Sequence, residues 1–411
     1  MIENDAVILG LLMVILGLIF WTHQLPGRLV RLFYSFVPML LLCYFLPSLL
    51  TLTGLVDPEG SQLYFVATRF LLPASLVLLT LSIDLGEVFR LGPKALIMFL
   101  TGTIGVVIGG PIALLIVGTF APQWVGGDGG EAIWRGLSTV AGSWIGGGAN
   151  QVAMKEMWEP SDSLFSLMVA VDVVVAQVWM TLLLFGVGKS RWIDAKLKAD
   201  ASSIDRLIEK MEAFSKKSRR LPTTTDLFVI LALAFGMTGL CHFLADLIAP
   251  WVGTNYPVLN QFSLNSTFFW LIILATTGGV VLSFSPARNM EGAGASQVGS
   301  VFIYVLVATI GLKMDVTAVM QNPGAFVIGG VWMLIHVSLL ALVAWRIRAP
   351  FFFLAVGSKA NIGGAASAPV IAAAFHPVLA PVGVLLAVVG YALGTYGAYL
   401  CALMMQAVAV Q

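Results

Sequence analysis

GSWIGGGAN at residues 142–150 and GSKANIGGAAS at residues 357–367 are the two segments that decide the fold. Each reads Gly-Ser, then Ile-Gly-Gly, then an alanine and a short polar residue. They lie within stretches 133–157 and 350–376, which are apolar on average but interrupted by glycine, serine, asparagine and proline. Such stretches are poor continuous helices, because glycine and proline have the lowest helix propensities. We therefore predict that each stretch turns back on itself as a hairpin.

The composition excludes a water-soluble fold. Apolar residues make up 59% of the 411 residues and charged residues 10%, whereas a soluble domain carries roughly 25% charged residues. A formal net charge of +1 gives no reason to expect a nucleic-acid partner. The three cysteines are far apart in apolar stretches, so neither a disulfide framework nor a metal cluster is predicted. The composition indicates a polytopic membrane protein whose partner is the lipid bilayer.

Ten apolar runs have the length of a membrane span. They lie at about 6–22, 32–54, 64–83, 95–118, 163–187, 225–248, 264–283, 298–314, 324–345 and 377–407. Together with the two hairpins, these runs predict an all-α membrane protein.

The distribution of positive charge predicts the orientation. If each hairpin enters and leaves by one face, most lysines and arginines fall on one side, including those from Lys189 to Arg220. The positive-inside rule assigns that side to the cytoplasm. The linker 189–222 is then cytoplasmic, and both termini are external to a bacterial plasma (inner) membrane. Full crossings by the two broken segments would instead place this basic linker outside.

The linker separates two similar halves, residues 1–188 and 223–411. Each half contains five predicted spans and one hairpin, and residues 78–98 resemble residues 307–328. Because five is an odd number of crossings, the halves must have opposite orientations. This is the inverted-repeat plan of secondary transporters, in which the binding site lies where interrupted segments meet near the midplane.

The linker itself has helical periodicity. Its apolar residues recur at helical spacing at Ile204, Leu207, Ile208, Met211 and Phe214. This pattern predicts an amphipathic helix that lies on the cytoplasmic membrane surface or against the helix bundle.

The broken segments leave backbone N–H and C=O groups without helical partners inside the hydrocarbon region. Carbonyls at helix C-termini, with hydroxyl and amide oxygens, suit a dehydrated cation such as Na⁺, whereas N–H groups at helix N-termini suit a carboxylate. The Na⁺ candidates are Ser143, Gly146, Asn150, Asp172 and Asn361. The solute-binding candidates are Gly147, Gly148, Asn150, Ser358, Lys359, Asn361, Gly363, Gly364 and Ser367. The alternative is that the glycines only allow close helix packing.

Two charged residues are candidates for coupling and for solute binding. Asp172 is the one carboxylate deep in a predicted span. We expect it to bind Na⁺ or a proton as the coupling group. The alternatives are a salt bridge to Arg69 and a protonated acid that is hydrogen-bonded to a neighbouring helix. Lys359 is the main candidate for a cationic side chain that binds an anionic solute. The alternative is that its side chain extends to the cytoplasmic interface. Lys155 and Glu156 close the first hairpin and are predicted to be a solvated rim pair.

No enzyme activity and no cofactor are predicted. Residues 186–190 resemble the end of a nucleotide-binding loop, but Leu183 stands where that motif requires glycine, and a predicted membrane helix stands where it requires a strand. Ser143 and Ser358 have no evident histidine or lysine base on a neighbouring turn, so nucleophilic catalysis lacks support.

The stretches GGGAN at 146–150 and GSKANIGG at 357–364 also carry a family resemblance. Over nearly its whole length the chain is similar to an uncharacterised bacterial polytopic membrane family, the domain of unknown function numbered eight-one-nine. More distantly it resembles the glutamate/sodium symporters and the 2-hydroxycarboxylate transporters. That resemblance implies two inverted five-helix repeats with one re-entrant hairpin each, a homodimer, and an elevator-type movement.

The same resemblance implies roles for particular residues. It points to Gly146, Gly147, Gly363 and Gly364 as the hairpin turns, flanked by polar contacts from Ser143, Asn150, Ser358 and Asn361. The symporters carry Gly-Gly-x-Gly, whereas the fourth position here is alanine, at Ala149 and Ala366. The resemblance therefore supports architecture and Na⁺ coupling better than it supports the identity of the solute.

These patterns predict a sodium-coupled symporter of a small organic anion, an amino acid or a short acidic peptide, working by alternating access. A cation/proton antiporter that uses Asp172 is the alternative among transporters. An ion channel is the alternative from another class, although the spans lack repeated polar rings.

Overall fold

The computed structural model describes all residues except 1, 38, 59, 200–203, 205–206, 209–220, 263, 315–321 and 410–411. Within this described part the chain is helical, and it contains no β-strand. The first half contains α1 (Asp5–His23), α2 (Arg28–Phe36), α3 (Met39–Leu52), α4 (Leu63–Val66), the π-helical turn η1 (Ala67–Leu71), α5 (Leu72–Leu81), α6 (Leu85–Arg90), α7 (Pro93–Phe120), α8 (Ile133–Trp158), α9 (Asp162–Val187) and α10 (Ser190–Leu197). The second half contains α12 (Thr224–Asn255), α13 (Thr267–Ser283), α14 (Ala295–Gly311), α15 (Gly324–Ile347), α16 (Phe351–Asn361), α17 (Gly364–Phe375) and α18 (Ala380–Val408).

Seven helical segments in the described part of the chain are long and apolar enough to cross a membrane. The bent pair α13 and η5 (Pro286–Ala293) would make an eighth if it is one span. Three of the ten predicted spans, 32–54, 264–283 and 298–314, therefore contain helices shorter than a full span. The first of these runs is divided between α2 and α3, and α13 ends before a bend of 94° into η5. Hydropathy alone missed these breaks, because apolar residues continue through them.

Short polar residues start several of the long helices. The Asn4 side chain accepts from backbone N–H groups at the start of α1, and Ser161 does the same for α9. Thr223 and Asp226 form a capping box at the start of α12. Such caps satisfy N–H groups that have no partner within the helix. They fix where the chain enters each apolar helix.

Helix α8 reverses direction at Gly147, where φ is 73° and ψ is −169°. The Arg135 side chain donates to the Trp158 carbonyl, and the rings of Trp134 and Trp158 have centroids 5.2 Å apart. A straight helix would separate residues 135 and 158 by about 34 Å. Residues 133–158 therefore form a hairpin, called hairpin 1, with its turn at Gly147.

Helices α16 and α17 form the corresponding structure in the second half. Gly363, which precedes α17, and Gly364, which begins it, have φ angles of 102° and 53°, values that favour glycine. Phe352 near the start of α16 and Phe375 at the end of α17 have ring centroids 5.3 Å apart. Residues 351–375, called hairpin 2, therefore also return to their starting level.

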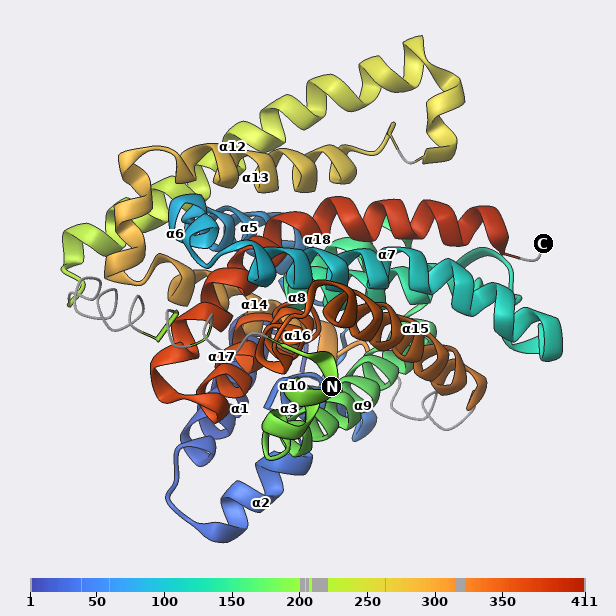
Figure 1. Cartoon of the computed structure of the whole chain (residues 1–411). Helices are drawn as coiled ribbons and strands as arrows, with labels where there is room; N and C mark the ends of the chain where they lie inside the picture. The colour runs from blue at the N-terminus through green and yellow to red at the C-terminus, as the bar shows by residue number, and fades with distance from the viewer. Residues whose placement is uncertain are drawn as a thin grey trace.

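Both hairpins pack against α18, which is shown in red in Figure 1. A Cβ at Gly390 would lie 2.7 Å from the Ile145 carbonyl oxygen and 3.3 Å from that of Ala360. A Cβ at Gly394 would lie 2.5 Å from Gly146 Cα. Glycine at these two positions lets the main chain of each hairpin approach α18 more closely than any side chain would allow.

The described residues of the predicted linker helix pack on the bundle. Ile204, Leu207 and Ile208 are helical and contact the apolar core, and Leu207 is 2% exposed. Met211 and Phe214 lie outside the described residues. Of the two predicted positions for this segment, the described part lies against the bundle.

Candidate functional site

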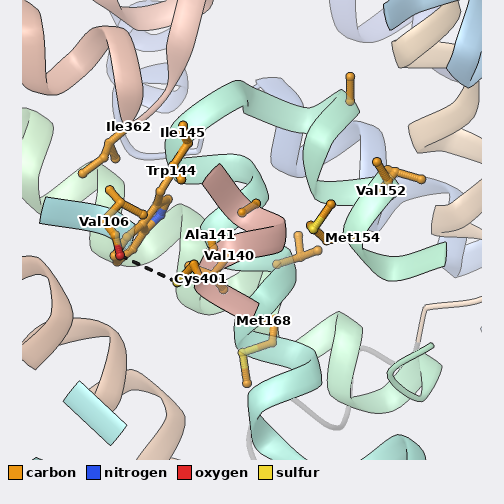
Figure 2. Close-up of a cluster of buried hydrophobic side chains, with 14 of the residues drawn as sticks. Val106, Val140, Ala141, Trp144, Ile145, Val152, Met154, Met168, Ile362 and Cys401 are labelled. Carbon is orange, nitrogen blue, oxygen red and sulfur yellow. Dashed lines mark hydrogen bonds between the residues drawn. The ribbon is translucent and has the colours of Figure 1, made fainter. Parts of the chain in front are cut away.

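The turns of the two hairpins meet beside one residue of α18, Tyr391. A Cβ at Gly147 would lie 3.5 Å from Tyr391 Cε1, and the Tyr391 hydroxyl accepts a hydrogen bond from the Ala365 N–H. The Asn150 amide donates to the Tyr391 carbonyl. Figure 2 shows both arms of hairpin 1, with Ile145 labelled before the turn and Val152 labelled after it. The broken ends of both hairpins therefore surround the middle of α18.

Lys359 in hairpin 2 is buried without a counterion in contact. The residue is 2% exposed, and among the described residues no acceptor lies within hydrogen-bond or ion-pair distance of its Nζ. Asp172 and His336 are near enough to interact with it electrostatically. An ammonium group removed from water without a bonded partner is costly. An anion beside Lys359 would offset that cost.

Ser367 and the start of α17 lie beside this ammonium group. An ideal Cβ at Gly363 would lie 3.1 Å from Lys359 Nζ and 2.2 Å from Ser367 Oγ. The Ser367 Oγ is buried and has no hydrogen-bond partner. Gly363 is the N-cap of α17 and offers no side chain to its first N–H groups. A cation, a free hydroxyl and a helix N-terminus thus meet at one point, and this combination suits a carboxylate.

Asp172 on α9 has the opposite environment. Its two carboxylate oxygens accept from Ser143 Oγ at 2.6 Å, Trp144 Nε1 at 2.7 Å and Gln151 Nε2 at 3.1 Å. These donors come from both sides of the turn in hairpin 1, so the carboxylate holds the two arms together. The alternative of a salt bridge from Asp172 to Arg69 is wrong, because Arg69 pairs with Glu156 instead.

Asn150 and Asn361, which are candidates for both Na⁺ and solute, have the same kinds of partner. The Asn150 amide nitrogen donates to the Gly146 and Tyr391 carbonyls, and its oxygen accepts from Thr395. The Asn361 amide nitrogen donates to the Gly357 and Phe99 carbonyls, and its oxygen accepts from Thr103. Each asparagine therefore uses one N–H donor within its own hairpin, and uses the other N–H and its amide oxygen to join the hairpin to a long helix, α18 or α7.

Ser358 lies beside a histidine of another helix, a neighbour that inspection of adjacent turns in the sequence does not reveal. His336 Nε2 is 2.9 Å from Ser358 Oγ, and Trp179 Nε1 donates to the same oxygen at 2.8 Å. His336 Nδ1 faces the Gly102 carbonyl at 3.1 Å, which requires that Nδ1 carry a proton. Both Ser358 and His336 are fully buried, and no carboxylate orients the imidazole among these contacts. The pair joins hairpin 2 to α15.

The prediction that Lys155 and Glu156 form a solvated rim pair is also wrong. Lys155 is 5% exposed, pairs with Asp162 at 2.6 Å and donates to the Tyr64 hydroxyl. That hydroxyl donates to Glu156, which also pairs with Arg69. The base of hairpin 1 is therefore closed by a connected network of charged and phenolic groups.

The remaining candidates lie at the two turns. Gly147 and Gly148 are partly exposed at the turn of hairpin 1, and Gly364 is buried at the turn of hairpin 2. Ser143 and Asp172 supply hard oxygen atoms of the kind that suits Na⁺. No group of three or more His, Cys, Asp or Glu side chains that could hold a metal is found in the described ranges.

The helices and these two hairpins define a polytopic α-helical membrane protein with buried charged groups at two helix breaks. The chain belongs to the family described as "Protein of unknown function (DUF819)", which matches residues 10–408. It is 24% identical over 367 residues to the uncharacterized membrane protein YjcL of Bacillus subtilis (strain 168), and the alignment covers 83% of each chain. The resemblance to the domain of unknown function numbered eight-one-nine is thereby confirmed.

Proposed function

We propose that this protein is a sodium-coupled symporter of a small organic anion, an amino acid or a short acidic peptide. The observation that carries the proposal is the buried Lys359 ammonium beside the unpartnered Ser367 hydroxyl at the N-terminus of α17. A solute carboxylate there neutralises the lysine and accepts from the hydroxyl and the main chain. The neutralised site then crosses the hydrophobic part of the membrane more easily than the empty, charged site.

Contacts at the bases of the hairpins support alternating access between two faces. The base of hairpin 2 adjoins residues predicted to be cytoplasmic: Lys94 donates to the Arg348 carbonyl, and the Phe351 N–H donates to Asp194. The base of hairpin 1 adjoins the predicted external side, through Tyr64 and Lys155. On this basis the hairpins enter from opposite faces, with both termini external.

The packing of the helices supports the inverted repeat. In the first half α1 packs on α3, and in the second half α12 packs on α13. Helix α3 contacts α14, and its counterpart α13 contacts α5, which is the counterpart of α14. We propose that the helices of these contacts form a scaffold, and that the hairpins with α7, α15 and α18 move against it as in an elevator. Figure 1 shows α12 and α13 along one edge of the molecule and α8 and α16 near its centre.

The role proposed for Na⁺ depends on Asp172. Its carboxylate fastens both arms of hairpin 1 through neutral donors, so a cation that binds there would exchange with one of these donors and alter the turn. The same observation supports the second candidate function, a cation/proton antiporter in which Asp172 takes up the proton. A homodimer and a location in the bacterial inner membrane complete the proposal.

Uptake into proteoliposomes tests the proposal. Purified protein is reconstituted, and labelled carboxylates, amino acids and acidic peptides are supplied with an inward Na⁺ gradient or with choline in its place. We expect accumulation of at least one solute that needs both Na⁺ and Lys359. Uptake that does not change when choline replaces Na⁺ would contradict sodium coupling. Proton release on cation entry, without solute uptake, would support the antiporter instead.

A further inference from the structure

A mostly apolar cavity lies near the base of hairpin 2. It has a volume of about 320 Å³ and lies between the end of α9, helix α10 and the first residue of α16. Its lining residues are Trp179, Leu182, Leu183, Phe185, Gly186, Lys189, Trp192, Ile193 and Phe351. Ligand pockets in proteins have volumes of roughly 300–1,000 Å³. The cavity is therefore large enough for part of a small apolar ligand.

The cavity has one charged residue, and this residue lies where α9 ends. Helix α9 ends at Val187, and Lys189 lies just beyond that end with its Nζ 4.5 Å from the centroid of the Phe185 ring. Phe185 and Trp192 are each 64% exposed, so the surface around the opening is aromatic. Aromatic rings and lysine at the end of a membrane helix are typical of the level of the lipid headgroups. The opening therefore faces lipid rather than water.

We propose that this cavity binds the acyl chain of an anionic phospholipid, whose phosphate lies against Lys189. An apolar interior takes the chain, and the ammonium group takes the charge. The linker from Lys189 to Arg220 holds ten of the 22 lysines and arginines, which further favours an anionic over a zwitterionic headgroup. This proposal requires only that the protein lies in a membrane, so it stands or falls independently of the proposed transport activity.

The lipid would contact two residues that hold hairpin 2. Trp179 lines the cavity and donates to Ser358, which precedes Lys359. Phe351 also lines the cavity, and its N–H donates to Asp194 of α10 at 2.7 Å. Burial raises the pKa of Asp194, an effect that the hydrogen bond from Phe351 partly offsets. A bound acyl chain would pack against both attachments, so it would stabilise the base of hairpin 2.

Native mass spectrometry of protein taken from nanodiscs tests the site. The nanodiscs contain equal amounts of phosphatidylglycerol and phosphatidylcholine. The variant Leu182→Trp fills the cavity, and Leu184→Trp is its matched control, because Leu184 is also exposed on α9 but does not line the cavity. Lys189→Gln removes the charge, and Lys196→Gln is the matched control on α10.

Wild-type protein should retain phosphatidylglycerol over phosphatidylcholine, and both controls should do the same. Leu182→Trp and Lys189→Gln should each lower this retention by about fivefold, which corresponds to about 1 kcal/mol for one lysine near an anionic surface. Equal retention of the two lipids by wild-type protein would overturn the proposal. Unchanged retention by Leu182→Trp would overturn it as well.

A fluorescence measurement keeps the proposal testable if a variant fails to fold. Brominated phosphatidylglycerol should quench wild-type tryptophan fluorescence more than brominated phosphatidylcholine does. That difference should become smaller in Trp192→Phe, where Trp179 remains in the cavity, and should keep its wild-type size in Trp345→Phe, since Trp345 is exposed on α15 away from the cavity. An undiminished difference in Trp192→Phe would contradict the assignment of the site.

Discussion

Hairpins 1 and 2 share a sequence pattern but differ in how their polar groups are satisfied. In hairpin 1 the donors Ser143, Trp144 and Gln151 all bond to Asp172. In hairpin 2 the buried Ser367 hydroxyl has no hydrogen-bond partner in the described part of the chain. Lys359 is 2% exposed as a residue, and no hydrogen bond or ion pair joins its ammonium group to another described residue. A polar group that is fully bonded holds a structure together, whereas one that is buried and unbonded is available to a ligand. The comparison indicates that hairpin 1 is held by its own hydrogen bonds, and it supports the proposal that hairpin 2 carries the solute site.

The largest effect is expected from removing the carboxylate that fastens hairpin 1. Asp172→Ala leaves three buried donors without an acceptor, and we expect the free energy of unfolding to fall by about 3 kcal/mol or more. Thermal unfolding in detergent measures this loss. Asp172→Asn is the control of similar shape and should recover part of it. A melting temperature that is unchanged in Asp172→Ala would show that the three hydrogen bonds do not hold the hairpin.

Replacing the charged residue of hairpin 2, Lys359, is expected to leave the stability unchanged or to raise it. Lys359→Met replaces an ammonium group that has no hydrogen bond or ion pair with an apolar side chain of similar length, and so removes a desolvation penalty that amounts to several kcal/mol for a buried ion. We expect the melting temperature without solute to stay the same or rise. Lys155→Met is the matched control: it removes a buried ammonium group that pairs with the exposed Asp162 and donates to the Tyr64 hydroxyl, so it should lower the melting temperature. A large loss of stability in Lys359→Met would mean that the lysine has a structural partner.

A smaller effect is expected at the turn of hairpin 2. Gly363→Ala places a Cβ at a residue with φ of 102° and between Lys359 Nζ and Ser367 Oγ, so it should cost about 1–2 kcal/mol and weaken solute binding. Gly148→Ala in hairpin 1 is the control, since its Cβ would meet only Ile303 at 3.7 Å. Equal effects of the two variants on binding would contradict the difference between the turns.

The smallest effects on stability are expected from replacing two serines, Ser143 in hairpin 1 and Ser367 in hairpin 2. Ser143→Ala removes a hydrogen bond to Asp172 and should cost about 1 kcal/mol, whereas Ser367→Ala removes a hydroxyl without a partner and should leave the melting temperature unchanged. Only Ser367→Ala should weaken solute binding directly. The comparison fails if Ser367→Ala is the more destabilising of the two.

The sequence predicts the helices and the positions of the turns better than it predicts the contacts. The length of the apolar runs in the sequence identifies α7, α9 and α18, because a membrane span needs about twenty apolar residues. The chain reversals at Gly147 and Gly363 coincide with glycine pairs, since only glycine adopts their φ angles without strain. The runs 32–54, 264–283 and 298–314 are predicted as full spans, but their helices α3, α13 and α14 are shorter, because apolar composition continues where a helix ends or bends.

The partners of the site residues are not predictable from local pattern. His336 contacts Ser358 across 22 residues, and Thr395 reaches Asn150 from the other half of the chain. Lys155 was expected at a wet rim, since neighbouring charges at a helix end usually face water, but Tyr64 and Asp162 enclose it. A buried partner from a distant helix leaves no periodic signal in the sequence.

The central claim is that hairpin 2 binds a carboxylate through Lys359. Thermal stabilisation by a panel of carboxylates, amino acids and acidic peptides in Na⁺ buffer tests it most directly, with wild-type protein and Lys359→Met measured side by side. We predict that at least one carboxylate raises the melting temperature of the wild-type protein and has no effect on the variant. Equal stabilisation of wild-type protein and Lys359→Met by that carboxylate would contradict the claim.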